Sequence, residues 1–330
     1  MRQEQVHLKV AGPADLLAVV PFWLGYEPSD CIVVLATRKG RVQVGCAMPR
    51  EQCFESDGLP AVRKMLGSCR SGTDYLIVGY GSPVPTEAAL LKVACVLDNR
   101  KLVEVILVEH DRYWVLTEGD RPTSDAGRLL DPMASSVTAA AIAAGLQAHG
   151  SRQELAANVQ GPDEDDDEAR FLWNEARDNV ATWSLERRFR FVDDCLHEAV
   201  DELHQPDALR CVELAVVVQQ IKLRDHAWMA MDLDTGWRHQ QLWLWVVAVT
   251  PPEVAAPVLC LAAMASWLSG GGALLTECIK RCEQLHPDYS MLALVRETYE
   301  RALPPEIWNK IGSAHTQGQR RCHRDLSECG

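Results

Sequence analysis

The sequence predicts an α/β N-terminal domain with a mixed, helix-covered sheet, followed by an all-α domain. In the first half, continuous apolar runs typical of buried strands alternate with amphipathic segments of helical period. The composition changes at the acidic segment 161–169, and the remainder shows only helical periods interrupted by proline and glycine. We therefore expect an α/β domain over 1–150, an acidic linker and helix start over 151–169, a helical domain over 170–312 and a flexible tail over 313–330.

The composition is that of a globular protein with about two domains. Of the 330 residues, 47% are hydrophobic and 24% charged, which is enough apolar material for a sizeable core. No uninterrupted apolar run reaches the ~18 residues that a membrane-spanning helix needs, so no membrane partner is expected. Residues 1–10 lack the apolar core of a signal peptide, and the 12 cysteines are scattered without a C-x-x-C pair. These features predict a cytoplasmic protein whose cysteines are mostly small buried side chains.

The charge balance argues against nucleic acid as a partner. The net charge is -13, whereas a protein that neutralises backbone phosphates needs a surplus of lysine and arginine. The basic run at 38–41 is interpreted as a hairpin turn instead.

The first elements follow from proline, glycine and apolar spacing. Pro13 and the apolar positions after it predict a short amphipathic helix, which Pro21 kinks and Gly25 ends. The "EPSD" corner at 27–30 then leads into an apolar run typical of a central strand. The expected elements up to the sheet edge are a strand at 31–37 with an antiparallel partner at 42–48, a helix at 59–70, a strand at 75–80, a helix at 86–98, a strand at 102–110 with a hairpin partner at 113–116, and a helix at 132–148.

The end of the helical half has a recognisable pattern. Trp267 and Gly270 precede one amphipathic helix at 273–286, and "HPDY" leads into the next, as in the core of a tetratricopeptide helical hairpin, which this segment resembles. One copy is readable, whereas a binding solenoid needs about three, so plain helix packing is favoured over a partner-binding groove. The residues expected on the buried faces are Leu275, Cys278, Ile279, Cys282 and Leu285, then Leu292, Val295, Tyr299 and Ala302.

Two turns at strand ends are candidate ligand sites. The segment from Gly79 to Thr86 joins a strand to a helix, and its glycines allow backbone N–H groups to face an anion. It lacks the Gly-Lys-Ser/Thr of a Walker loop and the G-x-G-x-x-G fingerprint, so a plain connection capped by Thr86 is the favoured alternative. The candidate ligand-binding residues of the two turns are Gly79, Gly81, Ser82, Thr86, Glu27 and Asp30.

Other clusters are better explained by structure than by chemistry. The acidic run 163–168 lacks the residue spacing of a calcium-binding loop. It predicts instead a solvent-exposed linker that leads into the N-terminus of a helix. Arg224 and Asp225 are interpreted as a structural ion pair that fixes two helices. No nucleophile motif is present, so no catalytic residue, metal or cofactor is predicted. The histidine, cysteine and acidic residues considered and set aside as metal ligands are Asp193, His197, Asp201 and His204 on one helix, Cys278 and Cys282 on an apolar face, and His315, Cys322, His323 and Cys329 in the tail.

Several segments together resemble one known family. The start "GPADLLAVVPFWLGYEPSDCIVVLA", the middle "GSRQELAANVQGP" and the helical segments "RDHAW", 251–290 and "LPPEIW" are similar to those of the actinobacterial Domain of Unknown Function 4192 family. Where that family has an arginine-x-aspartate-leucine-proline element, this chain has "CAMPR", and the cysteine-containing segment expected near 117–127 is absent. The resemblance implies no activity and no catalytic residue.

Two functions are expected. The first is a non-enzymatic cytoplasmic interaction or regulatory protein that binds another protein through its C-terminal helical hairpins, because no assembled catalytic set is readable. The alternative is a small-molecule or nucleotide-binding enzyme that uses the strand-end turns of the α/β domain.

Overall fold

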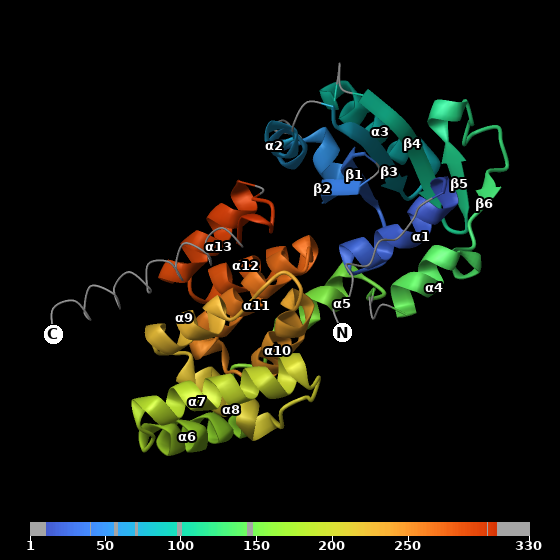
Figure 1. Cartoon of the computed structure of the whole chain (residues 1–330). Helices are drawn as coiled ribbons and strands as arrows, with labels where there is room; N and C mark the ends of the chain where they lie inside the picture. Colours follow the sequence, from blue (N-terminus) through green and yellow to red (C-terminus); the bar gives the residue numbers. More distant parts are fainter. Residues whose placement is uncertain are drawn as a thin grey trace, which may run out of the picture. The chain divides into compact units, whose positions relative to one another are not determined.

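The computed structural model describes residues 11–39, 41–55, 59–69, 72–97, 101–143, 148–301 and 303–308. The chain divides into two compact units (Figure 1). The sheet unit comprises Met1–Arg152 with Glu300–Pro304, and the helical unit comprises Gln153–Tyr299 with Pro305–Gly330. Each unit is described by itself below.

The sheet unit opens as its proline and glycine pattern predicts. Helix α1 begins at Pro13 and contains Pro21, and Gly25 ends it in the left-handed conformation that glycine tolerates best, at φ 82°. The elements of this unit are α1 Pro13–Leu24, β1 Cys31–Arg38, β2 Arg41–Pro49, η1 Arg50–Phe54, α2 Pro60–Ser68, β3 Asp74–Tyr80, α3 Pro83–Leu97, β4 Lys101–Glu109, β5 Arg112–Val115, η2 Leu116–Glu118, β6 Arg128–Leu129, η3 Pro132–Ala134, α4 Ser136–Ala143 and, at the unit boundary, α5 Arg152–Ala157.

The six strands form one mixed sheet in the order β2-β1-β3-β4-β5-β6. Strands β3 and β4 are parallel and joined through α3, while the pairs β1–β2, β1–β3, β4–β5 and β5–β6 are antiparallel. The predicted β1–β2 hairpin closes with Arg38 opposite Arg41. The fold class predicted from the apolar runs is therefore confirmed.

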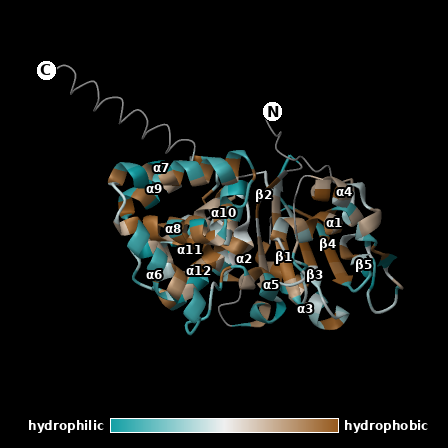
Figure 2. Ribbon diagram, turned by 90° about the horizontal axis from the view of Figure 1, so that it is seen from below, coloured by the Kyte–Doolittle hydropathy of each residue, from teal (hydrophilic) through white to brown (hydrophobic). Residues whose placement is uncertain are grey.

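Both faces of the sheet are covered by helices. Ile32, Ile77 and Leu107 point toward α2 and α3 and pack in one core with Leu90 and Val93. On the opposite face, α1 lies so close that a Cβ on Gly45 would collide with the ring of Trp23. Figure 2 shows the strands β1, β3 and β4 as the hydrophobic centre of this unit.

The helical unit is built around one fully buried helix. All residues of α11 are buried, and α11 packs against α9, α10 and α12. A helix that is apolar all round needs partners on every side, which these neighbours supply. The elements of this unit are α6 Asp167–Ala181, α7 Leu185–Leu196, the single π turn η4 His197–Asp201, α8 Ala208–Val217, α9 Ile221–Met229, α10 Gly236–Ala248, η5 Pro252–Val254, α11 Ala256–Leu268, α12 Gly272–Leu285 and α13 Ser290–Glu300.

Within the described residues no strand follows β6, as the change of composition at 161–169 predicts. No helix in the described part of the chain is long and apolar enough to cross a membrane. The C-terminal helices deviate from the expected buried faces at Tyr299, which is 42% exposed, and at Leu285. Leu285 is half-buried, and Ala302 lies outside the described residues. The likeness to a tetratricopeptide hairpin stays a prediction.

Two predicted boundaries in the sheet unit are wrong. Helix α3 begins at Pro83, so Thr86 lies inside its first turn and does not cap it. The expected helix at 132–148 is shorter: a 3-10 turn precedes α4, which is described from Ser136 to Ala143. Residues 144–147 lie outside the described part of the chain. In α3 the proline at the first helical position sets the start three residues before Thr86.

Candidate functional site

The two strand-end turns predicted as ligand sites meet at one arginine. Arg50 begins η1 directly after β2, and its Nη1 lies 2.9 Å from Oδ1 of Asp30. The same Nη1 donates to Oγ1 of Thr86 at 3.3 Å. A Cβ on Gly81 would lie 2.6 Å from Nη1 of Arg50 and 2.7 Å from Oδ1 of Asp30, so Gly81 leaves just enough room for the pair.

Arg50 already occupies this corner. Its side chain is 16% exposed and is bonded to Asp30, Thr86 and Glu51. The guanidinium therefore ties η1 to the residue that precedes β1 and to α3. Ser82 is exposed, and the main-chain N–H of Gly81 donates to Val108 rather than to open space. A ligand at these turns stays a prediction.

The remaining two residues of that prediction have packing roles. Gly79 faces α3, where a Cβ would meet Thr86 at 2.5 Å and Leu90 at 3.0 Å. Glu27 lies beyond α1, its N–H donates to the carbonyl of His149, and partial burial raises the pKa of its carboxyl group. Neither residue joins the cluster around Arg50.

The predicted ion pair of Arg224 and Asp225 is formed within α9. The Arg224 Nη2 lies 2.7 Å from Oδ1 of Asp225, and the Arg224 side chain is 9% exposed whereas that of Asp225 is 44% exposed. The link to another segment is made by the Arg224 Nη1, which donates to the hydroxyl of Tyr289 at 2.7 Å. Tyr289 thus supplies the connection that the sequence assigns to the pair.

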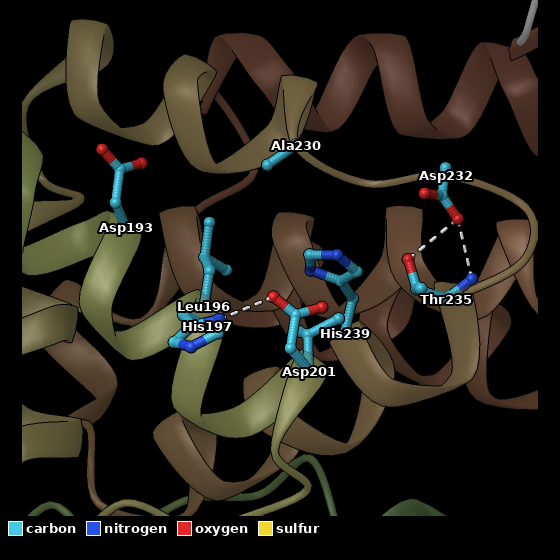
Figure 3. A pocket seen from close by; sticks show the side chains of 9 residues that line it. Asp193, Leu196, His197, Asp201, Ala230, Asp232, Thr235 and His239 are labelled. Atoms are coloured by element: carbon cyan, nitrogen blue, oxygen red, sulfur yellow. Dashed lines mark hydrogen bonds and ion pairs between the residues drawn. The ribbon is translucent and has the colours of Figure 1, made fainter. Parts of the chain in front are cut away.

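A polar pocket of about 250 Å³ opens in the helical unit (Figure 3). It lies where the end of α7 and the π turn η4 face the segment between α9 and α10. We call it the acidic pocket. Its lining residues are Asp193, Leu196, His197, Val200, Asp201, Ala230, Asp232, Thr235 and His239.

The π turn presents one wall of the acidic pocket. The N–H of Glu202 bonds to the carbonyl of His197, a wider turn than an α-helix makes. The Nη1 of Arg238 donates to the carbonyl of Val200 at 2.6 Å and satisfies an oxygen at the end of this turn. His197 and Asp201 are exposed at the rim of the acidic pocket, whereas Val200 is buried. Single π turns in α-helices are frequent at functional sites.

The opposite wall is the turn that starts α10. Oδ1 of Asp232 accepts hydrogen bonds from the N–H of Thr235 at 2.7 Å and from its hydroxyl at 2.8 Å. Aspartate commonly closes a turn in this way. Gly236 follows, where a Cβ would approach Leu268 of α11 to 3.0 Å. The glycine therefore lets α10 start tight against α11 and holds the Asp232 turn in place.

His239 forms the floor of the acidic pocket. It is only 2% exposed, and its Nδ1 is buried without a hydrogen-bond partner in the described residues. Burial lowers the pKa of its imidazole to about 4, against the opposing charges of Asp232 and Asp201, so the ring is neutral at pH 7. Figure 3 shows this ring between the carboxylate of Asp201 and the turn that carries Asp232 and Thr235.

Two histidine–aspartate pairs stand at the rim. The Nδ1 of His197 lies 2.8 Å from Oδ2 of Asp201, and this hydrogen bond raises the pKa of His197. Asp193 pairs with His226 of α9, with 2.6 Å between Oδ1 and Nε2. Helical spacing predicts that Asp193 and Asp201 both lie beside His197. In the structure only Asp201 bonds to His197, whereas Asp193 bonds to His226 of α9.

The lining of the acidic pocket carries three carboxylates, of which those of Asp201 and Asp232 act on the neutral imidazole of His239. The one hydroxyl of the lining, that of Thr235, is engaged by Asp232. Within the described residues no group of three histidine, cysteine, aspartate or glutamate side chains is arranged to hold a metal ion.

The sequence profile described as Domain of unknown function (DUF4192) matches residues 13–306 of the chain. This range includes every lining residue of the acidic pocket and every residue of the strand-end cluster. The chain belongs to the DUF4192 family. No curated protein and no solved structure matches it.

The sequence predicts no pocket here in this DUF4192 protein. It groups Asp193, His197 and Asp201, because each aspartate lies one helical turn from His197, as metal ligands that were set aside, and His204 is exposed and outside the lining. Asp232, Thr235 and His239 were missed. The "DLDTG" stretch carries the signal of an aspartate-closed turn before a helix. A buried histidine three residues into that helix has no signature of its own.

Most of the cysteines that the structure describes in this DUF4192 protein are buried. Cys278 and Cys282 lie in the core at 0% and 1% exposure, and Sγ of Cys282 is 4.0 Å from Sγ of Cys260. Burial raises the pKa of Cys31 and of Cys195 to about 12, which keeps these two thiols protonated. The tail residues His315, Cys322, His323 and Cys329 lie outside the described residues.

Proposed function

We propose that this protein is a non-enzymatic interaction or regulatory protein, and that its helical unit binds a basic segment of a protein partner at the acidic pocket. One observation carries the proposal. The pocket combines three carboxylates with a neutral, buried imidazole and contains no free nucleophile among its lining residues. Such a lining complements positive charge and lacks the parts of a hydrolytic or transfer site.

The charge of the whole chain supports this choice of partner. A net charge of -13 attracts basic surfaces and repels polyanions. The pocket adds local complementarity to this long-range attraction, because Asp193 and Asp201, at the end of α7 and in η4, line it together with Asp232 from the segment between α9 and α10.

A cytoplasmic location belongs to the same proposal. The cysteines of the described residues are all free thiols, as is typical of proteins in a reducing compartment. We keep the actinobacterial distribution implied by the family resemblance as a further prediction, and no part of the site argument depends on it.

A selection from a random peptide display library on the full-length protein tests the function. We expect enriched peptides to be rich in basic residues and to bind the wild-type protein with micromolar affinity, of the order of 1–100 μM. The double variant Asp201→Asn, Asp232→Asn removes two charges of the pocket with almost no change in volume. The dissociation constants of these peptides should be higher for this variant than for wild type by about tenfold or more.

The double variant Asp178→Asn, Glu186→Gln is the matched control, because it removes two exposed charges of α6 and α7 that do not line the pocket. Enriched peptides that bind both double variants equally would place the interaction elsewhere on the chain. A selection that enriches no peptide, although both proteins retain the wild-type melting temperature, would overturn the proposed function.

A further inference from the structure

The acidic pocket has the chemistry of a receptor for one particular side chain. Resting on the proposed function, we propose that it binds the guanidinium group of an arginine carried by the protein partner, with Asp201 and Asp232 as ion-pair partners and His239 as the buried hydrogen-bond partner.

Both aspartates keep one oxygen available. Oδ1 of Asp232 accepts both bonds from Thr235, and in the described part of the chain its Oδ2 has no hydrogen-bond partner. Oδ2 of Asp201 is taken by His197, and among the described residues its Oδ1 is likewise unbonded. The two free oxygens belong to different elements, the π turn and the turn before α10. A single chemical group that bonds to both oxygens must therefore carry several N–H donors that point in different directions.

His239 provides an independent indication of a ligand. A buried polar atom without a partner costs free energy, on the order of 1–3 kcal/mol for an unsatisfied donor or acceptor. Nδ1 of His239 is such an atom, on a side chain that lines the pocket and is only 2% exposed. In the tautomer with the proton on Nε2, Nδ1 accepts a hydrogen bond from an N–H donor of the ligand.

The apolar part of the lining matches the stem of a long basic side chain. Leu196, Val200 and Ala230 stand beside the carboxylates in the same pocket, and Leu196 and Val200 are buried. Arginine and lysine bury their methylene stems along such surfaces while the charged end finds polar partners. A naked metal ion would leave these walls without a partner.

The donor geometry selects arginine over lysine. A guanidinium carries five N–H donors in a rigid plane, so it reaches two separated carboxylates and an imidazole nitrogen at once. An ammonium offers three donors from one nitrogen, and a strongly hydrated one, so it satisfies the same atoms less well. The expected preference is about tenfold in the dissociation constant.

Three small probes test the chemistry on the full-length protein. They are N-acetyl-arginine-methylamide, its lysine analogue, and its citrulline analogue, which has nearly the shape of arginine without the charge. The readout is the ¹⁵N chemical shift of the His239 imidazole in protein labelled at histidine, assigned by its loss in the variant His239→Gln. The arginine probe should shift this resonance in a saturable way, the lysine probe should do so with a dissociation constant about tenfold higher, and the citrulline probe should show no measurable binding.

Single variants place the probe within the pocket. Asp201→Asn and Asp232→Asn should each weaken the arginine probe by about tenfold, because each removes one charged acceptor. Asp194→Asn is the matched control: it removes the same charge from the exposed side of α7 and does not line the pocket. The dissociation constant of the arginine probe for Asp194→Asn should stay within about twofold of the wild-type value. Free arginine differs from the capped probe by its α-carboxylate and its α-ammonium group. Comparing the dissociation constants of the two compounds therefore tells whether the pocket binds the free amino acid or an arginine side chain of a protein.

The outcomes distinguish the two proposals. Equal binding of the arginine and citrulline probes, or shifts of His239 that survive both aspartate variants, would overturn the guanidinium site. Free arginine binding about tenfold more tightly than the capped probe would overturn the peptide source of the guanidinium. If the display library yields peptides whose affinity is unchanged when their arginines become lysines, the interaction function stands and the arginine inference falls.

Discussion

At the scale of single residues, His239 couples the stability of the helical unit to pH. Its folded-state pKa of about 4 lies below the ordinary value of 6.5, so the unfolded chain binds a proton more strongly than the folded one. The contribution of the neutral ring is complete above about pH 6.5 and is lost as the pH falls toward 4. The loss amounts to about 3 kcal/mol in the free energy of unfolding.

Urea denaturation of wild type and His239→Gln between about pH 7 and pH 4 measures this effect. Since the carboxylates that face His239, Asp201 and Asp232, remain in both proteins, their titration cancels in the difference between the two curves. Wild type should lose more stability than the variant over this range. Parallel curves would show that the imidazole is not held neutral by burial.

Gly79 provides a second test at this scale, and it separates packing from ligand binding. A Cβ there would lie 2.5 Å from Cγ2 of Thr86, inside a core that has no space to relax. We expect Gly79→Ala to lower the free energy of unfolding by about 1–3 kcal/mol. Gly67→Ala in α2 is the control, since its Cβ would meet nothing within 4 Å. Equal stability of both variants would remove the packing role of Gly79.

Residue identities in the candidate site were only partly readable from the sequence. Asp193, His197 and Asp201 could be grouped because helical spacing brings positions four apart to one face. Arg50 gave no signal, because its contact with Asp30 and Thr86 depends on where three different turns meet in space. The buried Nδ1 of His239 is likewise a property of the packing around α10, and no local pattern encodes it.

At the scale of elements, the acidic stretch before α6 works as a helix start. The side chain of Asp166 accepts a hydrogen bond from the N–H of Ala169 at 2.9 Å and caps the helix. Asp166→Ala should cost about 1 kcal/mol in the free energy of unfolding, by loss of the cap. Asp165→Ala removes a neighbouring exposed charge that makes no cap and should leave stability within about 0.5 kcal/mol. Chemical denaturation of both variants decides, and equal losses would contradict a capping role for Asp166.

Element types were easier to predict than element boundaries. The central parts of β1, β3 and β4 are continuous apolar runs, which predicts their burial between two layers of helices. The start of α3 at Pro83 was missed because Thr86 offers an equally good capping side chain three residues later. The π turn was missed because one extra residue in a helical period leaves the amphipathic pattern of α7 almost unchanged.

At the scale of the whole molecule, each unit has a core of its own. Ile77 lies in the core of the sheet unit and Leu261 in that of the helical unit, both at 0% exposure. We expect two calorimetric transitions, with Ile77→Ala and Leu261→Ala each lowering one of them and destabilising its unit by about 2–5 kcal/mol. A single transition that both variants shift equally would show that the chain unfolds as one cooperative body.

The overall charge predicts how a basic partner arrives. A net charge of -13 attracts an arginine peptide over distances beyond contact, and salt screens this attraction with a Debye length of about 10 Å at 0.1 M. Stopped-flow measurements should therefore show an association rate constant that falls by about tenfold between low and high ionic strength. Asp232→Asn should instead raise the dissociation rate constant, because Asp232 contributes a short-range ion pair within the formed complex. An association rate independent of salt would mean that the charge of the chain plays no part in recognition, and the acidic pocket would have to find its partner by diffusion alone.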